Sequence, residues 1–177
     1  MQPFQAGAST GYITDGRLES DLATWLAGKV LPPQEVAPPP AAFMASLPDG
    51  ARAAVAALID RLAAGRFPEL WDVNLEWGRD VAALPGVAAD TFALANDGAG
   101  NYWLLCADGA VRSWCHDEGG AMEDHNSFAT LDDALACFVR YTAVREEQVP
   151  LDDVRAAFTA HGPDNGWTFF LEILEDL

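Results

Sequence analysis

The sequence is poor in positive charge. Lysine and arginine together number 10 among 177 residues, whereas aspartate and glutamate number 27, so the formal net charge is −17. An electrostatic field of this sign repels phosphate backbones and anionic lipids, which argues against nucleic acid or a membrane surface as the partner. The charge favours a basic protein partner, although solubility alone explains it equally well.

The sequence also has few cysteines and no long hydrophobic run. Cys106, Cys115 and Cys137 are an odd number without the spacing of a disulfide framework, so we expect free thiols in a reducing compartment. No stretch is long and apolar enough to cross a bilayer, and residues 1–5 lack the basic and apolar segments of a secretory signal. These absences predict a soluble, cytoplasmic protein.

Half of the residues are hydrophobic, which is enough for a substantial core. Apolar residues recur at helical spacing in four segments, which are residues 17–28, 49–64, 130–142 and the stretch after Pro150. Residues 32–40 contain five prolines, and because proline fixes φ and lacks an N–H, we expect an extended linker there. The predicted organisation is an N-terminal extension over 1–48, with a helix and this linker, followed by a domain over 49–177.

The middle of the chain has the pattern of a β-sheet. Three apolar segments predict strands, at residues 91–95, 101–106 and 111–115. The Asp108-Gly109 pair is typical of a type I′ hairpin turn, in which both central residues have positive φ. A helix that starts after Thr130, with acids in its first turn, can cover this small sheet.

Two segments are less specific. Residues 67–86 predict a short strand or irregular structure, and residues 167–176 fit either a strand or a last helix. The sequence as a whole therefore predicts an α+β fold, with a small antiparallel β-sheet flanked by helices and an N-terminal helical extension.

Three blocks of this region together resemble one family. The blocks are residues 92–105 (FALANDGAGNYWLL), 111–118 (VRSWCHDE) and 127–135 (SFATLDDAL). They are similar, in this order and spacing, to the glycine-rich turn with its aromatic strand, the V-x-x-W-x-H-D/E strand end and the S-F-x-x-F/L helix start of the SUKH superfamily, the Smi/Knr-like domains. The resemblance covers about residues 90–142.

The resemblance implies binding rather than catalysis. Bacterial members are regarded as immunity proteins that neutralise toxins delivered between cells, and fungal members act as scaffolding or regulatory proteins in cell-wall signalling. Toxin domains are often basic nucleases, so an acidic inhibitor would suit a cationic cleft. The first expectation is therefore an immunity protein that binds a cognate toxin, and the second is a general interaction or regulatory adaptor.

An enzymatic alternative rests on Cys115, His116 and Asp117, which offer a nucleophile, a base and an acid. Neighbours on a strand point to opposite faces, so the thiol would need a distant base such as His125 or His161. A metal site is a further alternative, since two histidines lie among acids at His116, Asp117, Glu118, Glu123, Asp124 and His125. A solvated acidic loop explains this cluster more simply, and we expect no catalytic residue, metal or cofactor.

The predicted partner-binding surface combines aromatic and acidic residues. In a half-covered sheet alternate residues face outwards, so Tyr102 and Trp114 are candidates for an exposed or groove-lining face. We expect the loop 116–126 and the acidic helix ends, including Glu146 and Glu147, to extend this surface. The residues predicted to bind the partner are Tyr102, Trp114, His116, Asp117, Glu118, Glu123, Asp124, Asp132 and Asp133.

Overall fold

The computed structural model describes residues 9–117 and 119–177, and for residues 121 and 123–125 the backbone alone. The elements are α1 (Arg17–Trp25), α2 (Ala41–Ser46), α3 (Asp49–Ala63), β1 (Asn74–Leu75), β2 (Thr91–Asn96), β3 (Tyr102–Cys106), β4 (Val111–Cys115), β5 (Ala121–Phe128), α4 (Leu131–Arg145), α5 (Leu151–Thr159) and α6 (Gly166–Glu175). None of the helices in these ranges has the length and apolar character needed to cross a bilayer.

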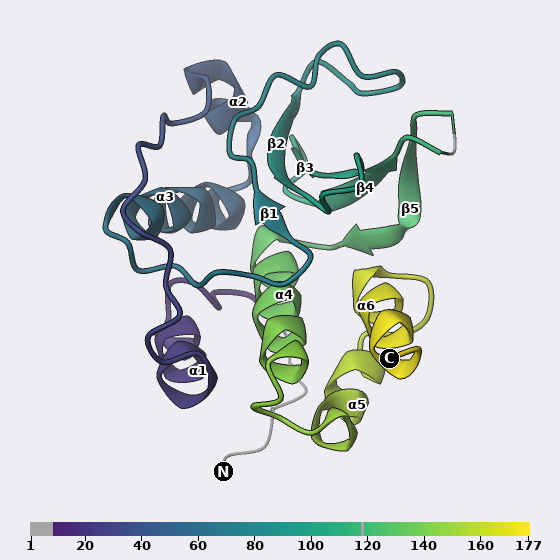
Figure 1. The fold of residues 1–177 in the computed structure, drawn as a ribbon. Coiled ribbons are helices and arrows are strands. Elements are labelled where there is room, and N and C mark those ends of the chain that lie inside the picture. Colours follow the sequence, from purple (N-terminus) through teal and green to yellow (C-terminus); the bar gives the residue numbers. More distant parts are fainter. Residues whose placement is uncertain (1–8, 118) are drawn as a thin grey trace.

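The strands form one five-stranded antiparallel sheet in the order β1-β2-β3-β4-β5, so each strand pairs with its neighbours in sequence. Figure 1 shows the curved sheet with α4 beneath it, α1 and α3 on one flank of α4, and α5 and α6 on the other. The predicted α+β fold, with a small antiparallel sheet flanked by helices, is confirmed.

The hairpin between β3 and β4 forms as predicted, but its turn is not type I′. Gly109 has a φ of 87°, whereas Asp108 is not among the residues with positive φ. The amide of Gly109 donates to the carbonyl of Cys106 at 2.9 Å, and the Asp108 carboxylate accepts from the amide of Ala110 at 3.0 Å. The bond from Gly109 to Cys106 places Ala107 and Asp108 at the centre of the turn, and Gly109 follows them as the left-handed residue, so positive φ is needed at one position only.

Helix α4 is the centre of the core, and Thr130 caps its N-terminus as predicted. The hydroxyl of Thr130 accepts from the amide of Asp133 at 3.1 Å. The ring of Phe138 lies against Trp103 of β3 and Phe128 of β5, with centroids 5.4 and 5.5 Å away. Aromatic contacts of this kind between helix and sheet fix how α4 sits on the strands.

The C-terminal segment is helical, which decides between the two structures that its sequence allowed. Asn165 caps α6, because its side chain accepts from the amides of Trp167 and Thr168 at 2.9 and 3.2 Å. The ring of Phe170 then stacks on Trp103 with centroids 5.6 Å apart. Helix α6 therefore covers the sheet beside α4.

The expectation of a loop over residues 116–126 is wrong. Strand β5 begins at Ala121 and pairs with β4, with Cys115 opposite Ala121 and Trp114 opposite Met122. The composition of this segment is polar, which predicts a loop, but β5 lies at the edge of the sheet. Charged residues are common on edge strands because they oppose pairing with another chain.

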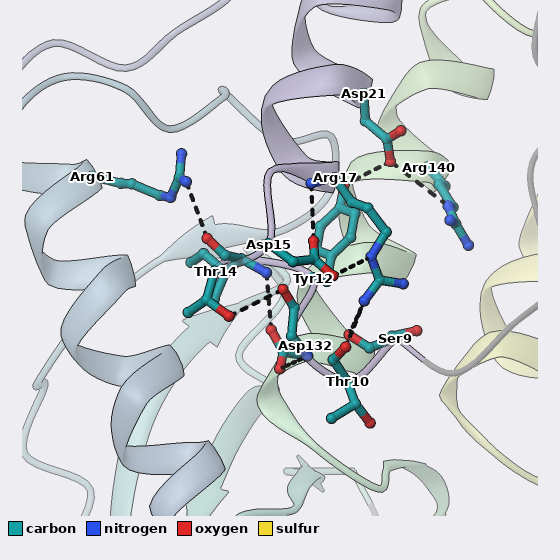
Figure 2. Close-up of polar contacts among 12 residues, drawn as sticks. Ser9, Thr10, Tyr12, Thr14, Asp15, Arg17, Asp21, Arg61, Asp132 and Arg140 are labelled. Carbon is teal, nitrogen blue, oxygen red and sulfur yellow. Dashed lines mark hydrogen bonds and ion pairs between the residues drawn. The ribbon is translucent and has the colours of Figure 1, made fainter.

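Residues 12–18 pack into the same core as the rest of the described chain. Tyr12, Ile13 and Leu18 are fully buried in the main hydrophobic cluster. Figure 2 shows the polar contacts that hold this segment, in which the hydroxyl of Tyr12 donates to Asp21 at 2.8 Å and Arg140 of α4 faces Asp21 at 3.9 Å. Burial raises the pKa of Asp21, while the bond from Tyr12 and the charge of Arg140 oppose this shift.

Candidate functional site

The two aromatic residues predicted to be exposed are buried. Tyr102 is 8% and Trp114 is 5% exposed, because Val81, Leu84 and Val87 cover the sheet face opposite the helices. The indole N–H of Trp114 donates to the carbonyls of Pro85 and Gly120 at 2.8 and 2.9 Å. Both side chains do point away from the helices, but they form a second small core there instead of a surface.

Asp132 is also not a surface residue. It is 7% exposed, and its carboxylate accepts from the amides of Gly11 and Ile13 at 2.7 and 3.0 Å. Figure 2 shows Asp132 beside the N-terminal segment that it holds. The adjacent Asp133 is half-buried and lies in the first turn of α4. The structure therefore gives Asp132 a role in the fold rather than at an interface.

His116 and Asp117 are exposed, as predicted, and extend a polar network from the β2–β3 turn. The carboxylate of Asp97 accepts from the side-chain amide of Asn101 at 2.6 Å, which turns the amide oxygen of Asn101 toward His116. That oxygen accepts from the backbone amide of His116 at 3.0 Å and lies 2.8 Å from its Nδ1. The other ring nitrogen lies 3.0 Å from Asp117. The network holds the ends of β3 and β4 together.

The remaining predicted residues fall in different places. Glu118 lies outside the described residues, and so do the side chains of Glu123 and Asp124. Glu146 is half-buried, pairs with Lys29 and accepts from the indole N–H of Trp71 at 2.5 Å. Glu147 is exposed, in a left-handed conformation with φ of 55°. Those residues of the predicted surface that the structure describes thus lie in separate parts of the fold.

An open pocket of about 560 Å³ lies between the helix-facing side of the sheet and α6. Its acidic residues are Asp72, Asp97 and Glu172. Its apolar residues are Trp103, Phe169, Phe170 and Ile173, and its other lining residues are Asn101, Ser113, Cys115 and Asn126. We call this site the acidic pocket, because the charged residues that line it within the described chain are all acids.

Two of the three carboxylates are held in place by other groups. Asp97 accepts from the amides of Ala99 and Asn101, at 2.8 and 3.1 Å, as well as from the side chain of Asn101. Asp72 accepts from the hydroxyl of Tyr141 at 2.6 Å and pairs with Arg145 at 2.9 Å. Burial, followed by the bond to Asp72, raises the pKa of Tyr141, so its hydroxyl keeps the proton that it donates.

The third carboxylate, of Glu172, is exposed on α6. Within the part of the chain that the structure describes, its side chain makes no hydrogen bond or ion pair. Phe169 and Ile173 are half-buried on the same helix and present apolar surface beside it. A free negative charge therefore lies next to accessible apolar groups.

The exposed Trp71 lies beside the acidic pocket. It is 42% exposed, and the guanidinium of Arg145 lies 4.8 Å from its ring centroid. Trp71, Glu69 and Glu146 line a second hollow of about 330 Å³, and Asp72 lines both sites. Sequence reasoning missed Trp71 and Asp72 as site residues. The signal that could have found them is the Trp-Asp pair itself, because a tryptophan in a turn-rich segment is a candidate for exposure.

The residues considered for catalysis, Cys115 and the more distant His161, have different surroundings. Cys115 lines the acidic pocket and is half-buried, but no hydrogen bond among the described residues joins its thiol to a histidine. His161 instead stacks on Trp167, with ring centroids 4.1 Å apart. Cys106 and Cys137 are buried free thiols, and burial raises the pKa of both.

The acidic cluster considered as an alternative metal site falls largely on side chains that lie outside the description, including that of His125. Of the residues described, no three histidine, cysteine, aspartate or glutamate side chains are grouped so that they could hold a metal ion.

Fold and site define an acidic α+β protein with an open, carboxylate-lined pocket beside its sheet. Comparison with known proteins adds no relative: no protein-family model matches the chain, and neither a curated protein nor a solved structure does.

Proposed function

We propose that this chain is a non-enzymatic binding protein of the immunity type, which captures and neutralises a cognate bacterial toxin in the cytoplasm. The resemblance to the SUKH superfamily motivates this function. The three blocks that resemble the family lie on β2 and β3, on β4, and across the end of β5 and the start of α4. These elements adjoin in the fold, so the blocks form one connected region rather than three isolated matches.

The observation that carries the proposal is the acidic pocket, which lies between this region, α6 and the segment before β1. It combines carboxylates with accessible apolar side chains, which is the composition expected of a surface that binds a basic protein. The formal charge of −17 acts in the same direction, because it accelerates encounter with a cationic partner.

The proposal is tested by expressing the neighbouring reading frame in bacteria with and without this protein. We expect the neighbouring product to arrest growth, this protein to restore growth, and the two proteins to co-purify as a complex. An unrelated toxin, expressed at a level that gives the same arrest, is the control and should not be rescued. Rescue of neither toxin, or binding to several unrelated cellular proteins instead, would favour the adaptor over the immunity function.

A further inference from the structure

We infer that the acidic pocket receives a basic segment of the partner, in which an arginine or lysine lies beside an apolar residue. The inference rests on the proposed binding function and specifies the chemistry of its partner. The expected ligand is a protein segment, because the pocket combines charge with an apolar floor in one open site of about 560 Å³.

The charge distribution selects a cation. Asp72, Asp97 and Glu172 approach the pocket from three separate segments, which precede β1, follow β2 and lie on α6. Asp72 already pairs with Arg145, whereas Asp97 and Glu172 make no ion pair within the described residues, so an incoming guanidinium or ammonium group would compensate their charge. Arginine is especially suitable because its planar fork donates two parallel hydrogen bonds to a carboxylate, and the exposed carboxylate of Glu172 can accept them.

The aromatic floor selects a side chain with apolar character rather than a small inorganic cation. Trp103 and Phe170 are buried beneath the pocket, while Phe169 and Ile173 are partly exposed at its side. A cation above an aromatic ring gains attraction from the ring quadrupole, and an apolar neighbour in the segment removes more surface from water. Exposed Trp71, beside the shared residue Asp72, extends this surface and is of the residue type enriched at binding hot spots.

The carboxylates are also preorganised. Asp97 is fixed by the turn amides, and Asp72 is fixed by Tyr141 and Arg145. Binding therefore orders fewer side chains than it would at a flexible acidic surface, which reduces its entropic cost. Glu172 is the adjustable acid, since its side chain makes no hydrogen bond or ion pair within the described residues and can follow the incoming cation.

The test compares two double variants of the full-length protein that remove the same number of charges. Asp72→Asn with Glu172→Gln removes two of the three carboxylates of the pocket, and asparagine tolerates the left-handed conformation at position 72, where φ is 54°. Glu35→Gln with Asp60→Asn is the matched control, because both acids are exposed and lie outside the pocket. The probe is a fluorescein-labelled peptide that alternates arginine and leucine, and a peptide that alternates glutamate and leucine is the negative probe.

We expect the pocket variant to weaken binding of the arginine peptide about tenfold, and the control variant to weaken it less than about twofold. Equal weakening in both variants would show that the overall electrostatic field alone attracts the peptide. Unchanged binding in both variants would show that the peptide binds outside the acidic pocket. Either result overturns the inference. Far-ultraviolet circular dichroism and thermal unfolding of each variant confirm that the fold is kept.

Cys115 gives a second measurement that requires no substitution in the pocket. It lines the pocket and is half-buried, whereas Cys106 and Cys137 are buried, so a maleimide should react with Cys115 first. We expect the arginine peptide to slow this labelling severalfold, and prior labelling to block the peptide. Labelling at an unchanged rate with saturating peptide would contradict the inference.

The cognate toxin separates the two proposals. If the pocket variant binds the toxin as tightly as the unchanged protein does, the assignment of the acidic pocket as the binding site is wrong but the immunity function stands. If no toxin is found while peptide binding still depends on Asp72 and Glu172, the immunity function is wrong but the pocket stands.

Discussion

Replacing Asp132 with alanine should undock the N-terminal segment from α4. The substitution removes the acceptor of the amides of Gly11 and Ile13, and the bond from Ile13 is buried. A buried donor without an acceptor costs about 1–3 kcal/mol. The amide of Gly11 is only partly buried and can recover water, so the two amides together should cost about 3 kcal/mol.

The same substitution removes a negative charge from the first turn of α4, which contributes about 0.3–1 kcal/mol through the helix dipole. Asp132→Ala should therefore lower the free energy of unfolding by about 3–4 kcal/mol, since the two effects act at different groups. Urea denaturation followed by tryptophan fluorescence measures this loss. Hydrogen exchange at residues 11 and 13 should also become faster than in the unchanged protein.

Asp133→Ala is the matched control for this prediction. Asp133 lies in the same first turn, but its carboxylate does not bind the N-terminal segment in the described structure. We expect it to lose only the dipole contribution, about 0.3–1 kcal/mol. Equal losses in the two variants, or unchanged exchange at residues 11 and 13 in Asp132→Ala, would refute the argument that Asp132 docks the segment.

Three further substitutions test other parts of the fold. Gly166→Ala should destabilise the protein by about 1–3 kcal/mol, because the added Cβ would lie 2.2 Å from the ring of Phe128. Thermal unfolding measures this loss, and an unchanged stability would mean that α6 can shift to make room. Trp114→Phe should cost about 1–2 kcal/mol in urea denaturation, since it removes the indole bonds to two carbonyls, and no loss would mean that water replaces them. Burial lowers the pKa of His161, so the unfolded chain binds more protons and the protein loses stability as pH drops through about 6.5. His161→Phe should therefore flatten the dependence of the free energy of unfolding on pH between pH 7 and pH 5. An unchanged slope would assign this dependence to other groups.

The elements that the sequence predicted well are those determined by local interactions. The cap at Thr130 acts over three residues, and the β3–β4 hairpin forms around the Asp108-Gly109 pair. The left-handed Gly65, with φ of 63°, follows the end of α3, where glycine is the most common residue. In each case the partners are close in sequence, so residue type and spacing contain enough information to predict the structure.

The features that were missed depend on partners far apart in sequence. Asp132 binds amides about 120 positions earlier, and no local pattern indicates that contact. Trp114 is buried by a proline- and glycine-containing segment near Pro85, whose apolar residues lack the periodicity of a strand or helix. The carboxylate of Asp72 is held at the acidic pocket by a hydrogen bond from Tyr141, which lies 69 positions later in the sequence. Half-covered sheets expose one face, but here an irregular segment covers it.

The composition of the acidic pocket suggests how partner choice is divided within the chain under the proposed function. Trp103, Ser113 and Cys115 come from the strands that resemble the SUKH superfamily, and they form part of the frame. Asp72 and Glu172 lie outside the region of resemblance, on exposed positions of segments that pack against it. Substitution of Glu172, which is exposed and makes no hydrogen bond or ion pair through its side chain in the described structure, should change stability little, so this part of the pocket's charge can change without disturbing the sheet. Specificity for one basic partner would therefore reside in the flanking segments, and a shared frame would serve different partners.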